Sequence, residues 1–154
     1  MKHIHSVLKN IEEIRKEKIS VDFFYNAAKG RFKLSMISDP QKGLDKIIRD
    51  PHINRPGLAL AGYTALFTFD RVQILGNTEM RYLKTLSAEQ RTKTLKKFFS
   101  FNMPCVCLTF NNKPSDEFME MADKKDIPVF ITPLETTKFA YFINDFLDDQ
   151  FSPQ

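Results

Sequence analysis

The chain has 154 residues, of which 42% are hydrophobic and 27% charged, and its formal net charge is +4. A chain of this length can bury about two-thirds of its unfolded surface, which is enough for one domain or two small lobes. It contains no run of about eighteen apolar residues, and its N-terminus lacks the apolar segment of a signal peptide. These features argue against membrane-spanning and secreted proteins, so we expect a cytoplasmic globular protein without a membrane partner.

Helical periodicity marks the beginning of the chain. Apolar residues recur at helical spacing over residues 4–14, and we treat residues 1–18 as an extra N-terminal helix that precedes the domain. Ser20 is placed to cap a second helix, because its hydroxyl can accept a hydrogen bond from an amide of the first turn. The apolar residues expected to be buried by this second helix are Val21, Phe24, Tyr25 and Ala28.

Two short strands are expected next, at residues 33–37 and 46–49. They lie on either side of residues 39–43, where aspartate, proline and glycine together predict a turn. We expect residues 19–63 to form a small N-terminal lobe that includes these strands.

Pro56 and Gly62 delimit a short helix in the following segment. Proline fixes φ and has no N–H donor, so it suits the first helical position and holds Arg55 extended before it. Gly62 lies one helical turn after Leu58 and is a good residue to end the helix.

A buried strand is predicted at residues 71–75, and Gly76 ends it. Thr78 is then expected to cap a short helix that reaches Leu83. A strand, a glycine and a capped helix form the kind of junction at which α/β proteins usually bind ligands.

Four residues around this junction are candidates for a ligand site or an interface: Arg55, Arg71, Thr78 and Glu79. Thr78 and the amides that follow it could bind an anion, and Arg55 could add a bidentate contact. Glu79 also has a simpler explanation, because the helix dipole favours a negative charge in the first turn by about 0.3–1 kcal/mol. Both explanations stay open at this point.

The next helix carries a cluster of basic residues. Ser87 and Gln90 form a plausible capping box, and the helix is expected to end near Phe101. Its basic residues are Arg91, Lys93, Lys96 and Lys97. A solvated helix face accounts for these charges. No aromatic residues alternate with them as base stacking would require, so we expect no nucleic-acid partner.

The second half of the chain predicts a strand at residues 104–110, a helix at 115–125 and a strand at 128–131. A βαβ unit of this length implies parallel strands joined by a right-handed crossover. The last helix presents an apolar stripe made of Phe139, Phe142, Ile143, Phe146 and Leu147. We therefore expect residues 64–151 to form a three-layer α/β core, with a parallel or mixed sheet flanked by helices and a final linker helix.

The cysteines and histidines do not predict a catalytic or metal site. Cys105 and Cys107 alternate with Val106, so both side chains point to one face of a strand. Their Cβ atoms would be about 7 Å apart, whereas a disulfide needs about 4 Å, so we expect two small buried apolar residues. The histidines at positions 3, 5 and 52 form no metal-binding cluster.

The order and spacing of several segments carry a family resemblance. These segments are residues 53–63, 71–79, 103–109 and 126–134. From about Ile19 to Pro153 the chain resembles the N-terminal domain of HPr kinase/phosphorylase, the bacterial enzyme that phosphorylates a serine of the sugar-transport protein HPr. Residues 135–153 look like the helix that leads into the kinase domain of that family. The resemblance implies an α/β fold similar to the N-terminal domains of Mur ligases.

The catalytic half of that family is missing from this sequence. A P-loop has the pattern G-x-x-x-x-G-K-[ST], because clustered backbone amides hold the phosphate and the lysine neutralises it. The chain has 5 glycines, and none is followed by Lys-Ser or Lys-Thr. We therefore expect a regulatory half, either an expressed fragment or a truncated gene product, that has no catalytic residues and phosphorylates nothing alone.

The resemblance also implies partners. The full-length family uses ATP and Mg²⁺ to phosphorylate HPr, also removes that phosphate, and works as an oligomer in carbon catabolite repression. This chain would then need no cofactor and would contact the downstream kinase domain or neighbouring subunits, with HPr as a further candidate. The main alternative is a free-standing ligand-sensing domain of the same fold without a kinase partner. A small transferase or hydrolase would need a nucleophile–base pair, which three scattered histidines do not supply.

Overall fold

The structure, a computed structural model, describes residues 16–151, so the helix expected over residues 4–14 lies outside the described part. The strands are β1 (Ile19–Ser20), β2 (Ser35–Met36), β3 (Ile47–Ile48), β4 (Ile53–Asn54), β5 (Val72–Leu75), β6 (Val106–Leu108) and β7 (Val129–Ile131). The helices are α2 (Val21–Arg31), α3 (Gly57–Leu60), α4 (Asn77–Thr85), α5 (Ala88–Phe98), α6 (Asp116–Lys124) and α7 (Thr136–Phe151).

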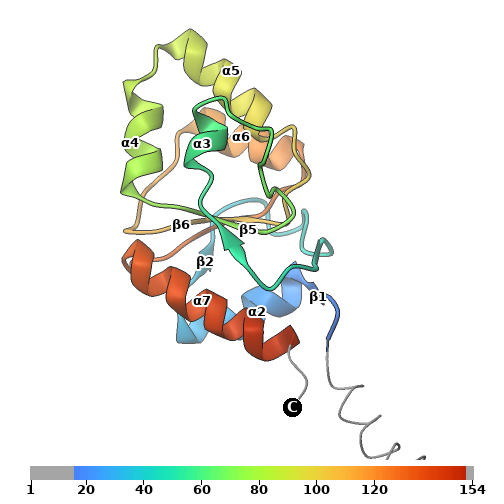
Figure 1. Ribbon diagram of the computed structural model, residues 1–154. Coiled ribbons are helices and arrows are strands. Elements are labelled where there is room, and N and C mark those ends of the chain that lie inside the picture. The colour runs from blue at the N-terminus through green and yellow to red at the C-terminus, as the bar shows by residue number, and fades with distance from the viewer. Residues whose placement is uncertain (1–15, 152–154) are drawn as a thin grey trace, which may run out of the picture.

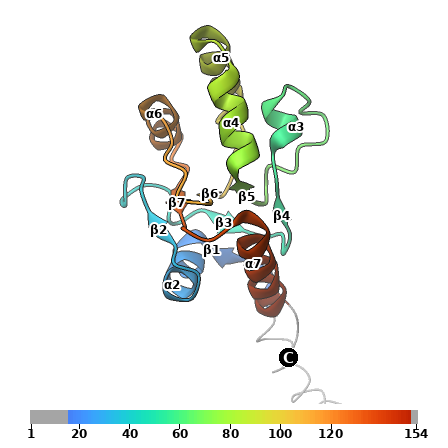
Figure 2. The same cartoon turned by 90° about the vertical axis from the view of Figure 1, so that its left-hand side faces the viewer.

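A mixed sheet forms the middle of three layers, as the sequence predicts (Figure 1). Its five strands lie in the order β2-β7-β6-β5-β4. The four strands from β4 to β7 are parallel, and β2 runs antiparallel at one edge. Helices α3, α4, α5 and α6 cover one face, and α2 and α7 cover the other (Figure 2). The predicted βαβ unit is confirmed by the parallel pair β6–β7.

Side chains alternate between the two faces of the sheet and separate the core into two clusters. Cys105, Cys107 and Phe130 face α2 and α7, whereas Val106 and Val129 face α4, α5 and α6. The prediction that both cysteines are buried on one face is confirmed, and both are free thiols with no exposed surface.

The predicted cap of α2 and the predicted apolar stripe of α7 are also confirmed. Ser20 accepts a hydrogen bond from the Phe23 amide at 3.0 Å and caps α2. The predicted stripe of α7 packs onto the sheet through Phe139, Ile143, Phe146 and Leu147, which are all buried. Phe142 is half-buried and stacks on Phe32 of the segment after α2, with the ring centroids 5.5 Å apart.

The segment expected to form a small lobe, residues 19–63, is joined to the rest of the fold. β1 and β3 do make a separate antiparallel sheet of two strands. However, β2 and β4 enter the main sheet beside β7 and β5, and α2 shares a core cluster with α7. The strands expected at 33–37 and 46–49 therefore pair with distant partners and not across the turn between them, and packing is continuous across residue 63.

The short helix α3 begins one residue later than predicted. Pro56 is the N-cap and not the first helical residue, because its carbonyl accepts the first helical hydrogen bond. Gly62 ends the helix as expected, with φ of +107°. The Tyr63 amide reaches back to the Leu58 carbonyl at 2.9 Å, which is the hydrogen bond of a Schellman motif. The chain after α3 is therefore held in one conformation.

No helix among residues 16–151 combines the length and the hydropathy that a membrane crossing requires.

Candidate functional site

The carboxyl ends of the parallel strands bring four chain segments together. Arg55 follows β4, Gly76 follows β5 and Thr109 follows β6, while Thr136 begins α7 after β7. We call this set of residues, together with Glu79, the carboxyl edge. Parallel strands place their carboxyl ends at one edge of a sheet, so residues far apart in the sequence meet here.

The prediction that Thr78 caps α4 is wrong. The helix begins at Asn77, and Gly76 is its N-cap. Glycine offers no side-chain acceptor, so the backbone amide of Gly76 donates instead to Glu79 Oε1, at 2.6 Å. Glu79 thereby supplies one half of a capping box, and Thr78 is left exposed in the first turn.

Glu79 also binds Arg55 across 24 residues of sequence. Arg55 Nη2 lies 2.8 Å from Oε1 and 3.0 Å from Oε2 of this carboxylate. The Glu79 side chain is only 6% exposed, whereas that of Arg55 is 39% exposed. The buried charge is therefore both paired and hydrogen-bonded, as a buried carboxylate requires.

A threonine pair closes the same edge from the side of β6 and α7. The hydroxyls of Thr109 and Thr136 are 2.6 Å apart and buried. Gly76 packs so closely against Thr136 that an added Cβ would overlap Thr136 Oγ1 and approach Arg55 Nη2 to 3.2 Å. This glycine is thus needed for close approach, and the space at the edge is filled by the chain's own side chains.

The four candidates from the sequence do not form a single site. Arg71 precedes β5, and its Nε binds Asp50 Oδ2 at 3.1 Å. Because a parallel strand rises about 3.3 Å per residue, Arg71 lies roughly 16 Å from Gly76 at the opposite end of β5. The structure brings Arg55 and Glu79 together, with Thr78 exposed beside them. A ligand at these residues stays a prediction, while the contacts of Glu79 favour its structural explanation.

Sheet topology also bears on the ligand hypothesis. Doubly wound proteins bind ligands where the strand order reverses, because neighbouring crossovers then leave for opposite faces and open a crevice. Here β4, β5, β6 and β7 follow chain order, and their connecting helices α3, α4, α5 and α6 lie on one face (Figure 2). The described part of the sheet therefore has no such reversal.

Gln73 is a polar residue in the middle of the buried strand β5, and the sequence-based predictions gave it no role. Its Nε2 donates to the carbonyls of Thr68 and Arg71, both at 2.9 Å, and its Oε1 accepts from Asn54 at 2.8 Å. The side chain has no exposed surface. It ties β4 and the loop before β5 to the sheet, and a polar residue inside an apolar strand was the signal that could have revealed it.

An exposed apolar surface adjoins Arg55. Leu58 is 71%, Tyr63 54% and Leu66 78% exposed, and we call these three residues the α3 surface. Together with Arg55 and other residues they line a hollow of about 130 Å³. Large contiguous apolar patches on a protein surface commonly mark interaction sites. Sequence reasoning did not find this surface, because exposure is decided by what packs over α3.

Comparisons with known proteins decide the family. A family model described as the N terminus of HPr serine kinase matches residues 19–147. The chain belongs to this family. It is 46% identical over 140 residues to an HPr kinase/phosphorylase of Chlorobaculum tepidum, covering 90% of this chain and 41% of that protein. An HPr kinase/phosphorylase of Pelodictyon phaeoclathratiforme is 44% identical over 142 residues, with 90% and 42% covered. The chain thus spans less than half the length of these curated relatives.

A solved structure also resembles the fold. It contains the CBS and DRTGG domains of the regulatory region of Clostridium perfringens pyrophosphatase, complexed with the activator diadenosine tetraphosphate. The TM-score is 0.58 at 13% sequence identity, and the match covers 84% of this chain and 50% of the other. At that identity the likeness concerns the fold alone.

The residues of the carboxyl edge all fall within the stretch 19–147 that matches the HPr serine kinase family.

Outside this edge, two side chains among residues 16–151 have clearly shifted pKa values. Burial raises the pKa of the Cys107 thiol well above its usual range, helped by its neighbour Cys105. Burial lowers the pKa of Lys46, against the opposing effect of Asp126, and its ammonium donates to Asn102 Oδ1.

Potential metal ligands are scattered over the described residues. No group of 3 or more His, Cys, Asp or Glu residues within 16–151 is placed to hold a metal ion. His52 lies 3.2 Å from Asp50 at the surface, and the other two histidines fall outside the described residues.

Proposed function

We propose that this chain is the non-catalytic regulatory and assembly domain of an HPr kinase/phosphorylase. One observation carries the proposal. The family model matches residues 19–147, yet the chain covers only 41–42% of the two HPr kinase/phosphorylases described above. The rest of such a protein has room for the kinase domain, and the present sequence contains no P-loop. What these residues supply is a scaffold with interfaces.

For the full-length protein we propose the activities that the family name implies. It would use ATP and Mg²⁺ to phosphorylate a serine of HPr in the cytoplasm and would also remove that phosphate. The domain would contribute to control of sugar transport and carbon catabolite repression by changing assembly or sensing an effector. The cofactors would bind in the kinase domain and not here, because this sequence has no P-loop, the motif whose clustered amides and lysine bind nucleotide phosphates.

We further propose that the α3 surface is the contact face toward the kinase domain or a neighbouring subunit. Exposure of three large side chains costs the folded domain little stability. Each of them would contribute about 1.5–3 kcal/mol to the free energy of association when a partner buries it. Arg55 borders the same hollow, and only its Nη2 is used for Glu79 among the contacts of the described residues. Its other nitrogens can bind a carboxylate of the partner, while Glu79 holds the guanidinium in place.

Binding and activity of the 154-residue chain test the non-catalytic assignment. Calorimetry with ATP and with fructose 1,6-bisphosphate, beside an HPr phosphorylation assay, should give no ATP binding and no phosphotransfer. Binding of the sugar phosphate would place effector sensing in this domain. Phosphorylation of HPr by this chain alone would refute the proposal.

Variants of the full-length enzyme test the contact face. Leu58→Ser and Leu66→Ser should weaken its assembly by about tenfold or more each, because one buried leucine is worth about 1.5–3 kcal/mol. Tyr141→Ser is the matched control, since Tyr141 is 68% exposed on α7 and does not border the α3 surface. Sedimentation equilibrium would measure the assembly. Equal behaviour of all three variants would refute this face as the interface without affecting the family assignment.

A further inference from the structure

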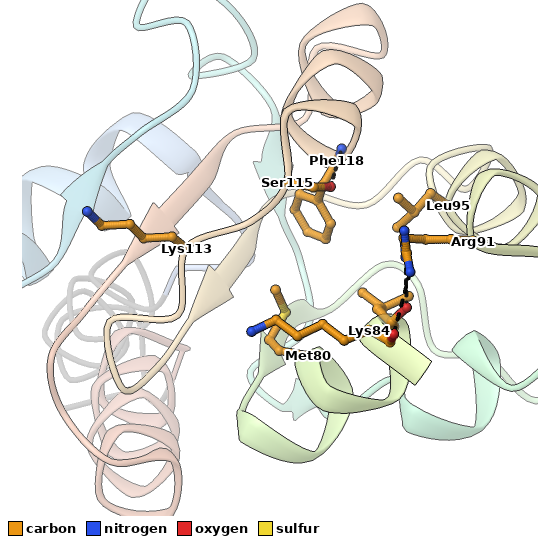
Figure 3. Close-up of a pocket in the computed structure, with 8 residues that line it drawn as sticks. Met80, Lys84, Arg91, Leu95, Lys113, Ser115 and Phe118 are labelled. Carbon is orange, nitrogen blue, oxygen red and sulfur yellow. Dashed lines mark hydrogen bonds between the residues drawn. The ribbon is translucent and has the colours of Figure 1, made fainter. Parts of the chain in front are cut away.

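A cavity of about 200 Å³ lies between α4, α5 and α6 (Figure 3). Its apolar wall is formed by Met80 and Leu83 from α4, Leu95 from α5 and Phe118 from α6. These four side chains are between 1% and 5% exposed, so they belong to the core beneath the helices. An apolar cavity of about 150 Å³ can hold a benzene molecule, so this space has room for one aromatic ring or a branched side chain.

Arg91 fixes one wall of this cavity without filling it. Its Nε donates to the carbonyl of Leu83 at 2.8 Å, and Nη2 donates to that of Leu86 at 2.8 Å. These carbonyls belong to the last turn of α4 and the residues after it, so the guanidinium caps the end of that helix and sets its distance from α5. The guanidinium of Arg91 thus already has hydrogen-bond partners within the fold.

Lys84 supplies a cation at the opening that the fold does not use. Its side chain runs past Met80, whereas the ammonium of Lys113 points away from the other lining residues (Figure 3). Among the described residues, the ion pairs do not include Lys84. On α6, the acidic residues Asp116 and Glu117 lie between the lining residues Ser115 and Phe118 in the sequence, and Glu117 accepts a hydrogen bond from Thr92 of α5. An anion at the opening would therefore meet an unpaired ammonium.

We propose that this cavity is a binding site for a small amphipathic acid. The ligand has an apolar group about the size of one aromatic ring, which enters between Met80, Leu95 and Phe118. It carries a carboxylate or a phosphate group, which pairs with Lys84 at the opening. Because the walls belong to three helices of one domain, the site needs no second chain, and it is separate from the α3 surface proposed above as a contact face.

Amide NMR of the 154-residue chain tests the site directly. The probes are phenylpropionate, phenyl phosphate and the neutral phenylpropanol, together with a capped tripeptide that has phenylalanine between two aspartates. The two acids should shift the amides of α4, α5 and α6, with dissociation constants on the order of 1 mM, as expected for ligands of about ten heavy atoms. Phenylpropanol should bind about threefold to fivefold more weakly, since one exposed ion pair is worth up to about 1 kcal/mol.

Two variants and a control separate the parts of the proposal. Lys84→Met should abolish the advantage of the acids over phenylpropanol, whereas Lys96→Met, at an exposed lysine of α5 outside the cavity, should not. Leu95→Phe should fill the cavity and prevent binding of all probes. Absence of shifts at the lining amides, or equal binding of acid and alcohol, would overturn the proposal. Shifts with the tripeptide alone would overturn a small-molecule ligand in favour of a protein segment.

Discussion

Replacing Glu79 tests whether its buried carboxylate holds the carboxyl edge together. In Glu79→Ala the Gly76 amide loses its acceptor in a buried position, which costs about 1–3 kcal/mol. Loss of the pair with Arg55 adds about 0.5–1 kcal/mol, a small value because the Arg55 side chain is 39% exposed and water can replace its partner. We therefore expect the free energy of unfolding to fall by about 1.5–4 kcal/mol.

Two further variants divide this total. Glu79→Gln keeps the size and one acceptor oxygen but removes the charge, so it should cost about 1–2 kcal/mol, because hydrogen bonds to charged groups are the stronger ones. Arg55→Met leaves the bond between Glu79 and Gly76 in place but removes the cation from a carboxylate that is only 6% exposed, so it should cost about 1–3 kcal/mol. A double-mutant cycle of the two positions then gives their coupling free energy directly.

Urea unfolding followed by circular dichroism at neutral pH is the assay. The matched control is Glu89→Ala, because Glu89 is 83% exposed and pairs with Lys93 at 3.8 Å within one helix. Such a pair is worth about 0.3–0.5 kcal/mol. If Glu79→Ala costs no more than the control, the carboxylate does not stabilise the edge, and its contacts with Gly76 and Arg55 contribute nothing measurable to the fold.

Three other changes have defined outcomes. Gly76→Ala should lower the unfolding free energy by about 1–3 kcal/mol, because the added Cβ would overlap Thr136 Oγ1. Thr136→Ala removes that oxygen, so Gly76→Ala should cost less in a Thr136→Ala background, and an equal cost there would contradict the overlap as the cause. Gln73→Leu should cost about 2–3 kcal/mol in urea unfolding, since the carbonyls of Thr68 and Arg71 and the side-chain amide of Asn54 each lose a hydrogen bond, and a neutral result would contradict this. Burial raises the pKa of Cys107, so its contribution to the free energy of unfolding is fully present below the unfolded thiol pKa of about 8.5 and is lost as the pH rises above it. Cys107→Ala should therefore flatten the decline of stability at high pH. Rapid chemical labelling of the native thiols would contradict their burial.

Local sequence signals determined the helices and the family. Ser20 and Ser87 each accept a hydrogen bond from an amide three residues later, as predicted. Ser115, which the sequence placed inside its helix, caps α6 in the same way. Gly62 ends α3 with a positive φ. These interactions span at most one or two turns, so the residues that decide them are neighbours in the sequence. The order of such segments also sufficed to place the chain in the HPr serine kinase family.

Tertiary structure decided the strand partners and the site. No local signal shows that β2 pairs with β7, because two-residue strands carry no periodicity and their partner lies about a hundred residues away. Likewise, the sequence offered Arg55 and Glu79 as ligand-binding candidates, and only the fold brings them into contact with each other. The sequence alone indicated the helices, the longer strands, their order and the family, but not the two-residue strands β1 and β4. Contacts between distant segments decide which polar groups are paired inside the fold and which apolar side chains stay exposed. Those contacts are determined by tertiary packing, which no local sequence pattern shows.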